Sequence, residues 1–199
     1  MGKDIYDNRH SIYCYDGSDV LINKLDIKDK ALLQKYEAKI VAAKLLALRK
    51  KGIIGNFDIE HLKNIHKYLF EDVYPFAGNF RTENIAKGVF RFAEWEYIET
   101  ELTNLMNKLK SENFLADFDK NNLAEKLAFY LSELNVLHPF REGNGRTTRE
   151  FIRELALKND YILNLKKVNP KDFLNASIKS IVDTTDLTNL INVCLEKKL

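Results

Sequence analysis

Apolar residues recur every three or four positions over most of this chain, which is the spacing of one face of a helix. The first such stretch runs from about Asp29 to Arg49, and its apolar positions are Leu33, Tyr36, Ile40, Val41, Leu45, Leu46 and Leu48. Because this stripe is wide, we expect the helix to be well buried. Gly52 and Gly55 follow the stripe and predict its end.

Six further helices are predicted by the same spacing. One begins at Asp58, a favourable N-cap residue, and carries Ile59, Leu62, Ile65 and Leu69 on one face. The others are expected near residues 94–110, 122–137, 146–158, 170–182 and 186–197. Asn122 and Glu125 resemble a capping box at the start of the 122–137 helix. The leucine stripe of that helix predicts an ordinary core face, because its heptads do not persist as they would in a coiled coil.

Residues 84–93 form the only β-like segment of the sequence. Phe90 and Phe92 alternate with Arg91, and Lys87-Gly88 is a favourable turn. The pattern as a whole therefore predicts an all-α fold with one small β-hairpin. With 199 residues, the chain is long enough for one domain with a substantial core, so we expect a single domain over residues 1–199.

The charge balance and the cysteine content narrow the possible partners and the compartment. Lys and Arg number 31 and Asp and Glu 29, which gives a net charge of only +2. General electrostatic binding to nucleic acid or to an anionic membrane is therefore not expected. The first residues hold no apolar run, and Cys14 and Cys194 have no disulfide or zinc-site spacing. We expect a cytoplasmic protein without a membrane segment.

The segment from His138 to Arg149 carries the candidate chemistry. Pro139 disfavours the helical conformation for His138, so the preceding helix should end there. Gly143 and Gly145 let the turn adopt backbone angles that direct several N–H groups to one point. Another helix should then begin at Gly145 or Arg146, and the N-terminus of a helix is a favourable site for an anion.

Charged side chains around this turn suit a nucleotide polyphosphate. Arg146, Arg149 and Arg153 share one helix face, and a guanidinium binds phosphate oxygens in a bidentate fork. Glu142 is placed to hold Mg²⁺, which typically takes one or two carboxylates together with phosphate oxygens. The imidazole of His138 is a suitable acceptor for a hydroxyl proton near neutral pH.

These residues resemble the motif of the Fic (filamentation induced by cAMP) family, written HxFx[D/E]GNGRxxR. Every specified position is present: His138, Phe140, Glu142, Gly143, Asn144, Gly145, Arg146 and Arg149. The resemblance extends to residues 12–25, which are similar to the entry segment of bacterial toxin-type members. Residues 66–81 are similar to the segment ahead of the family's flap, with Phe76 where Trp is commoner.

The resemblance implies transfer of AMP from ATP to a Tyr, Thr or Ser hydroxyl of a target protein, with release of pyrophosphate. His138 would be the catalytic base, and Glu142 would hold Mg²⁺. The nucleotide would be bound by Gly143, Asn144, Gly145, Arg146 and Arg149. The flap that clamps the target would be formed by Ile85, Ala86, Lys87, Gly88, Val89 and Phe90. Members that transfer a phosphate carry a larger residue where this chain has Gly145, so AMP transfer is expected.

An inhibitory segment found in many Fic proteins is missing from this sequence. That segment reads [S/T]xxxE[G/N], and its Glu pairs with the second motif arginine. None of the 15 Glu residues has Ser or Thr four positions earlier, including Glu196 in the predicted C-terminal helix. We therefore expect a separate small antitoxin that supplies this Glu to Arg149. Toxin-type relatives often modify DNA topoisomerases, which makes a topoisomerase the expected target.

Two alternatives to this assignment remain at the sequence level. The chain could be a catalytically silent Fic-fold binding module, or a variant that transfers another phosphate-containing group.

Several other polar or reactive residues have simpler structural interpretations. His66 is expected to be a hydrogen-bonded core histidine, whereas His10 and His61 should lie on the surface. Arg153 is expected to be a solvated partner of Glu150 or Glu154, and Cys194 a small buried residue.

Overall fold

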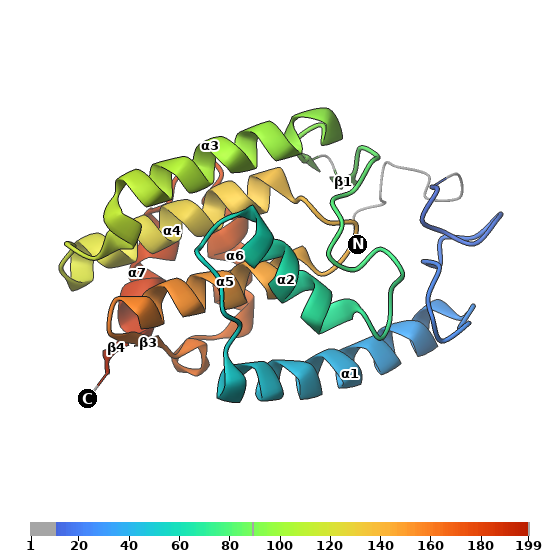
Figure 1. Ribbon diagram of the computed structural model, residues 1–199, viewed down its shortest axis with the longest axis horizontal. Coiled ribbons are helices and arrows are strands. Elements are labelled where there is room, and N and C mark those ends of the chain that lie inside the picture. The colour runs from blue at the N-terminus through green and yellow to red at the C-terminus, as the bar shows by residue number, and fades with distance from the viewer. Residues whose placement is uncertain (1–10, 89, 199) are drawn as a thin grey trace. The chain divides into compact units, whose positions relative to one another are not determined.

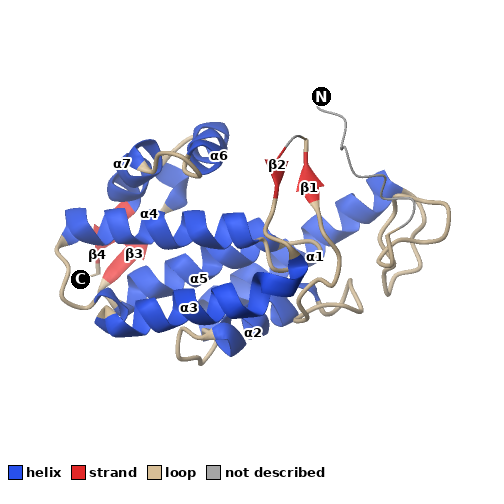
Figure 2. Ribbon diagram, turned by 90° about the horizontal axis from the view of Figure 1, so that it is seen from above, coloured by secondary structure: helices blue, strands red, loops and turns tan. Residues whose placement is uncertain are grey.

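The computed structural model describes residues 11–88 and 90–198, and the fold is predominantly helical, as predicted (Figure 1). The α-helices are α1 (Lys30–Lys51), α2 (Ile59–Phe70), α3 (Ile98–Ser111), α4 (Lys120–Leu137), α5 (Asn144–Lys158), α6 (Pro170–Lys179) and α7 (Thr185–Cys194). Two antiparallel strand pairs join β1 (Ala86–Lys87) to β2 (Phe90–Arg91) and β3 (Tyr161–Leu163) to β4 (Leu195–Lys197) (Figure 2). Short 3₁₀ turns lie at Trp95–Tyr97, Asn113–Leu115 and Leu165–Lys167.

The described residues form two compact units, each assembled from segments that are distant in the sequence. The first unit contains the described part of 1–56 together with 60–99 and 138–144. The second unit contains 57–59, 100–137 and the described part of 145–199. The prediction of a single domain over 1–199 stays a prediction.

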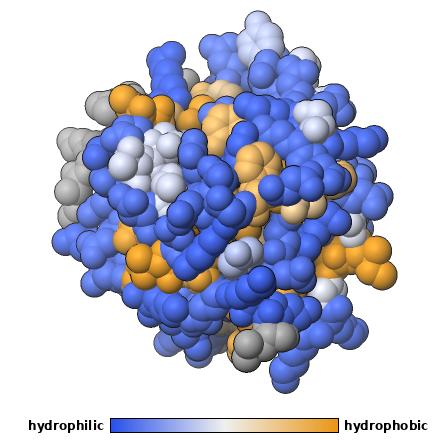
Figure 3. Space-filling model, turned by 90° about the vertical axis from the view of Figure 1, so that its left-hand side faces the viewer, coloured by the Kyte–Doolittle hydropathy of each residue, from blue (hydrophilic) through white to orange (hydrophobic). Residues whose placement is uncertain are grey.

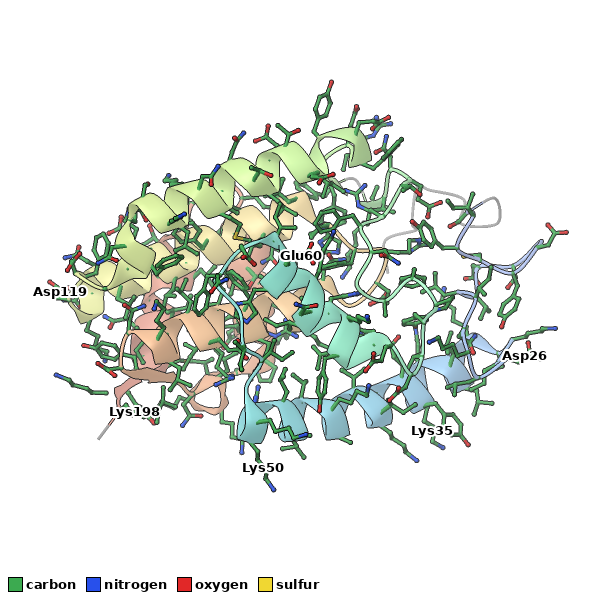
Figure 4. The ribbon with its side chains drawn as sticks, viewed as in Figure 1. Asp26, Lys35, Lys50, Glu60, Asp119 and Lys198 are labelled. Carbon is green, nitrogen blue, oxygen red and sulfur yellow. The ribbon has the colours of Figure 1, made fainter. Side chains whose placement is uncertain are left out.

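Helix α1 in the first unit is less buried than its sequence predicts. Its N-terminus is capped by Asp29, whose side chain accepts a hydrogen bond of 2.7 Å from the backbone N–H of Leu32. The residues that the helix buries are Leu33, Glu37, Val41 and Leu48, whereas Leu46 is 65% exposed. Lysines share the outer face with the apolar side chains, and Figure 4 shows Lys35 and Lys50 projecting away from the helix.

The predicted hairpin is present in the first unit, and its strands are short. Ala86 pairs with Arg91, and Lys87 with Phe90. Gly88 lies in the turn at a φ of 62°, a left-handed conformation that glycine adopts without steric cost. Val89, which the sequence places in the flap, lies outside the described residues.

Helix α4 is the centre of the second unit and packs against α6 and α7 (Figure 2). Its apolar face is fully buried, as the leucine stripe predicts. Ser132 on α4 donates a hydrogen bond of 2.9 Å to the carbonyl of Ser180. The predicted cap is wrong, because Asp119 accepts the backbone N–H of Asn122 at 2.9 Å and the helix begins at Lys120. Figure 4 shows Asp119 at the start of α4.

The C-terminal segment differs from the prediction, because the last helix ends at Cys194 and a strand follows. Leu195 pairs with Leu163 in the β3–β4 sheet, and both side chains are buried. Glu196 therefore lies on a strand, where its carboxylate binds Lys167 at 2.6 Å. The prediction of only one hairpin missed this second pair of strands. Cys194 is fully buried, as predicted, and burial raises the pKa of its thiol.

The surface of the molecule is mainly polar on the face drawn in Figure 3, where hydrophobic side chains occupy separate small areas. Among the helices of the described ranges, none combines the length and the hydrophobicity that crossing a bilayer requires.

Candidate active site

His138 directly follows α4 and has an unusual backbone conformation. The helix ends at Leu137, as the following proline predicts, and His138 has a φ of 46°. A left-handed conformation is strained for a residue with a side chain, and such strain persists where the surroundings enforce it. Here the carbonyl of His138 accepts a hydrogen bond of 2.8 Å from Nε of Arg81.

The imidazole of His138 lies against the end of the β1–β2 hairpin. The ring of Phe92, the first residue after β2, stacks on it at a centroid distance of 3.8 Å and an interplanar angle of 22°. This contact joins the predicted catalytic base to the predicted flap within the first unit. A stacked ring restricts the orientations that the imidazole adopts, and that orientation decides whether it can reach an acceptor hydroxyl.

His66 on α2 is fully buried and binds the motif loop, residues 138–143 between α4 and α5. This confirms its interpretation as a core histidine. Its Nδ1 accepts a hydrogen bond of 2.8 Å from the backbone N–H of Gly78, so its Nε2 carries the proton. Nε2 donates that proton to the carbonyl of Glu142 at 2.9 Å. The ring also stacks on Phe140 at 3.8 Å and 4°.

The expectation for His61 is wrong, because this side chain is only 2% exposed. Gly55 lies directly against its ring, and a Cβ at that position would overlap the imidazole. His10 lies outside the described residues.

The loop between His138 and α5 is closed by its own polar groups. The side chain of Asn144 accepts the N–H of Phe140 at 2.8 Å and donates to its carbonyl at 2.6 Å. The carboxylate of Glu142 accepts the N–H of Gly143 at 2.8 Å. Gly143 has a φ of 82°, and a Cβ there would overlap the ring of Phe70. Glycine is therefore required at this position by both conformation and space.

Arg81 belongs to the segment 66–81 that resembles the Fic family, but no role is predicted for it from sequence. Arg81 is only 1% exposed, and its guanidinium donates to three backbone carbonyls. Nε bonds to His138 at 2.8 Å, Nη1 to Glu83 at 2.7 Å, and Nη2 to Ala93. Burial lowers the pKa of Arg81 to about 10, so the side chain remains charged at neutral pH.

A partly buried ion pair adds to these links in the first unit. Arg141 of the motif loop donates to the carboxylate of Glu83 at 2.8 Å, and Ser11 donates to the same oxygen at 2.6 Å. Glu83 precedes β1, so this pair ties the start of the hairpin segment to the motif loop.

The first two turns of α5 carry the two motif arginines, Arg146 and Arg149. Gly145, Arg146 and Arg149 belong to the second unit, whereas His138, Glu142, Gly143 and Asn144 belong to the first. Burial, and secondly the nearby charge of Arg146, lower the pKa of the Arg149 guanidinium. Two neighbouring cations close to the N-terminus of a helix suit a polyanionic ligand.

Gly145 lies close to the side chain of Arg149, which follows it by about one turn of α5. A Cβ at position 145 would stand 3.1 Å from Nη1 of Arg149. The absence of a side chain at Gly145 therefore leaves room for the guanidinium of Arg149.

The remaining predictions for α5 are largely confirmed. The residue pattern also predicts that Thr148, Phe151, Ile152 and Leu155 share a face that anchors this helix in the core, and all four are buried. Arg153 pairs with Glu150 at 2.7 Å and with Glu154 at 3.6 Å. These acidic side chains are buried, however, so the expectation of a solvated pair is wrong in this respect.

Comparison with known proteins places these features in a family context. The profile of the Fic/DOC family matches residues 56–156. The chain is 37% identical over 186 residues to protein adenylyltransferase VbhT of Bartonella schoenbuchensis, and the match covers 94% of this chain but only 39% of VbhT. It is 32% identical to a protein of Escherichia coli named "Probable protein adenylyltransferase Fic", with coverage of 83% of this chain and 82% of that protein.

Solved structures have the same fold. The N-terminal Fic domain of a Bartonella quintana Bep effector with bound ADP superposes with a TM-score of 0.86 at 26% identity, covering 94% of this chain and 95% of that chain. BepC of Bartonella tribocorum with bound AMPPNP gives a TM-score of 0.88 at 24% identity, covering 94% and 97%.

Proposed function

Because the chain belongs to the Fic/DOC family, we propose that it is a protein adenylyltransferase, which transfers AMP from ATP to a side-chain hydroxyl of another protein. The observation that carries the proposal is His138, which follows α4 in a strained conformation and stacks on the end of the hairpin. This placement brings a proton acceptor to the segment that the family uses as a flap.

The proposed reaction is a displacement at the α-phosphorus of ATP. His138 accepts the proton of the acceptor hydroxyl, and the oxygen forms a bond to the α-phosphorus. The bond from that phosphorus to the bridging oxygen of the β-phosphate breaks, and pyrophosphate leaves. Donors at the start of α5 would stabilise the negative charge: the backbone of Gly143, Asn144 and Gly145 at the phosphates, and Arg146 and Arg149 at the β- and γ-phosphates.

Glu142 is the residue that would hold Mg²⁺. Its carboxylate is half-buried and oriented by the N–H of Gly143, and one carboxylate with phosphate oxygens is a usual ligand set for this ion. When bound, Mg²⁺ would offset the charge of the phosphates.

We also propose that the β1–β2 hairpin binds the target by strand addition. Its strands are short and partly exposed, and strand addition uses backbone hydrogen bonds more than side chains. The residues concerned are Ile85, Ala86, Lys87, Gly88, Val89 and Phe90. A DNA topoisomerase in the cytoplasm is the target that the family resemblance favours.

Control by a separate antitoxin is supported by the position of Glu196. This residue lies on β4 and pairs with Lys167, in no inhibitory helix. A small partner protein carrying [S/T]xxxE[G/N] would supply the Glu that pairs with Arg149 and prevents productive placement of ATP.

Labelled nucleotides test the proposed reaction. The protein is incubated with a cell lysate and with ATP labelled at either the α- or the γ-phosphate. We expect protein labelling from α-labelled ATP only, and His138→Ala should abolish it while ATP affinity, measured by calorimetry, is retained. Labelling from γ-labelled ATP only would indicate phosphoryl transfer, and no labelling from either would indicate a silent binding module.

A further inference from the structure

We propose that Arg81 is a positioning residue that fixes the hairpin segment 84–93 relative to the backbone of His138. The inference rests on the proposed function and deepens it: Arg81 would control use of the protein acceptor and not the binding of ATP. Arg81 itself lies outside the proposed nucleotide and acceptor contacts.

The three nitrogens of one guanidinium bind three different parts of the first unit. Glu83 stands before β1 and Ala93 after β2, so Nη1 and Nη2 hold the two ends of the hairpin segment. Nε holds the carbonyl of His138. The backbone N–H of Arg81 adds a bond of 2.9 Å to the carbonyl of Pro139. The planar guanidinium of Arg81 thus determines the separation between the two ends of the hairpin segment and the backbone of His138.

The hairpin needs such an attachment because its own pairing is minimal. Among the described residues, its ladder contains two residue pairs, and one further backbone bond of 3.3 Å joins the N–H of Phe92 to the carbonyl of Ile85. An isolated two-stranded hairpin has marginal stability in water. The attachment of the two hairpin ends to Arg81 therefore determines where the strands β1 and β2 lie. A strand that receives a target by backbone pairing must also have a fixed register relative to His138, since a one-residue slip reverses the direction of every side chain.

Lysine cannot replace arginine in this role. The three carbonyls are arranged to accept from the rigid planar fork, whereas an ammonium is a compact charge on a flexible stem. Arg81→Lys keeps the charge but loses the fork, so it separates geometry from charge. Arg81→Gln removes the charge as well.

The only tryptophan of the chain provides a readout that is independent of activity. Trp95 is 38% exposed, and its backbone N–H donates to the side chain of Asn84 at 2.9 Å across the base of the hairpin. If the base of the hairpin is released from Arg81, the indole of Trp95 should become more accessible to solvent. Quenching of its fluorescence by acrylamide then measures the attachment directly.

The experiment compares Arg81→Lys and Arg81→Gln with Arg153→Lys. Arg153→Lys is the matched control, because it disturbs a half-buried arginine on α5 that pairs with Glu150 and has no part in the hairpin. We expect the quenching constant of Trp95 to rise about twofold in both Arg81 variants, and to stay unchanged in the control. With the main labelled lysate protein purified as acceptor, the KM for acceptor should rise about tenfold, because the strand that pairs with it is no longer held in position, while the KM for ATP stays within about twofold.

The outcomes separate this inference from the proposed function. Unchanged quenching in both Arg81 variants, or equal increases in the two KM values, would overturn the role of Arg81. A wild-type protein that transfers no AMP would overturn the proposed function and the acceptor role together, whereas the quenching comparison would still decide the attachment. If neither variant folds, ¹⁵N NMR of the wild-type arginine side chains decides it: separate Nη1 and Nη2 signals support the fork, and averaged signals contradict it.

Discussion

The ring of Phe92 lies 3.8 Å from the ring of His138 and only 22° from parallel to it. One ring ends the hairpin and the other is the proposed catalytic base, so each limits the movement of the other. On the proposed function, binding of a target at the hairpin would therefore be coupled to the orientation of the His138 imidazole.

Replacing Phe92 by Ala tests this coupling. A stacked aromatic pair contributes about 0.5–1.5 kcal/mol, so AMP transfer should fall by roughly threefold to tenfold while ATP affinity is unchanged. Phe92→Tyr keeps the ring and should retain most of the activity. Transfer at the wild-type rate by the alanine variant would show that the stack does not orient His138.

Gly143→Ala should destabilise the fold strongly, because the new Cβ would overlap the ring of Phe70. Gly17→Ala is the matched control: its φ of 65° is similar to the 82° of Gly143, but nothing lies within 4 Å of the added atom. Backbone strain alone should cost about 1–2 kcal/mol at Gly17. Overpacking should add about 1–3 kcal/mol at Gly143. Urea denaturation measures both, and equal losses would contradict the steric argument.

Gly145→Val should weaken ATP binding. A Cβ at this position would stand 3.1 Å from Nη1 of Arg149, so the larger valine would displace that guanidinium. Loss of charged hydrogen bonds to phosphate corresponds to at least about tenfold in affinity, and Arg149→Ala should give a similar loss. Calorimetric titration with ATP provides the comparison. If Gly145→Val binds ATP normally and Arg149→Ala does not, crowding at position 145 is not the cause.

Stability should fall in acid partly through Glu112. Burial raises the pKa of this carboxyl. Hydrogen bonds from Lys126 at 2.7 Å and Tyr130 at 2.9 Å lower the pKa by more than burial raises it, so the net shift is downward. A pKa that is lowered in the folded state stabilises the fold at pH values above the pKa of the unfolded state, which is about 4.3 for Glu. This stabilisation is lost as the pH falls through the pKa of the folded state. Glu112→Gln should reduce stability at pH 7 and flatten this acid-side decline. Urea midpoints between pH 3 and 7, measured for both proteins, check the slope.

The helices could be predicted from sequence because each carries a long apolar stripe, as in α4. Their ends were less certain: Asp119 and Asn122 are both good cap residues, and only the structure shows which one accepts the N–H. The β3–β4 pair was missed because three-residue strands such as Leu195–Lys197 are too short to show alternation. The same segment continues the apolar spacing of α7, which favoured a longer helix.

The candidate site was predictable where side-chain chemistry defines it and not where backbone atoms do. His138 and Glu142 stand out because their functional groups are characteristic of proton transfer and metal binding. Arg81 binds three carbonyls, and every residue has a carbonyl, so no residue pattern identifies its partners. His61 was misplaced for a related reason: its burial depends on the close approach of Gly55, which helical spacing does not reveal.

His66 has a consequence for spectroscopy that follows from its two hydrogen bonds. Because Nδ1 accepts from Gly78 and Nε2 donates to Glu142, the ring is held in one neutral tautomer, whose two nitrogens differ widely in ¹⁵N chemical shift. These two resonances report on the hydrogen bond between His66 and Glu142 of the motif loop. Any remodelling of that loop when nucleotide enters would register on an atom that the nucleotide does not touch.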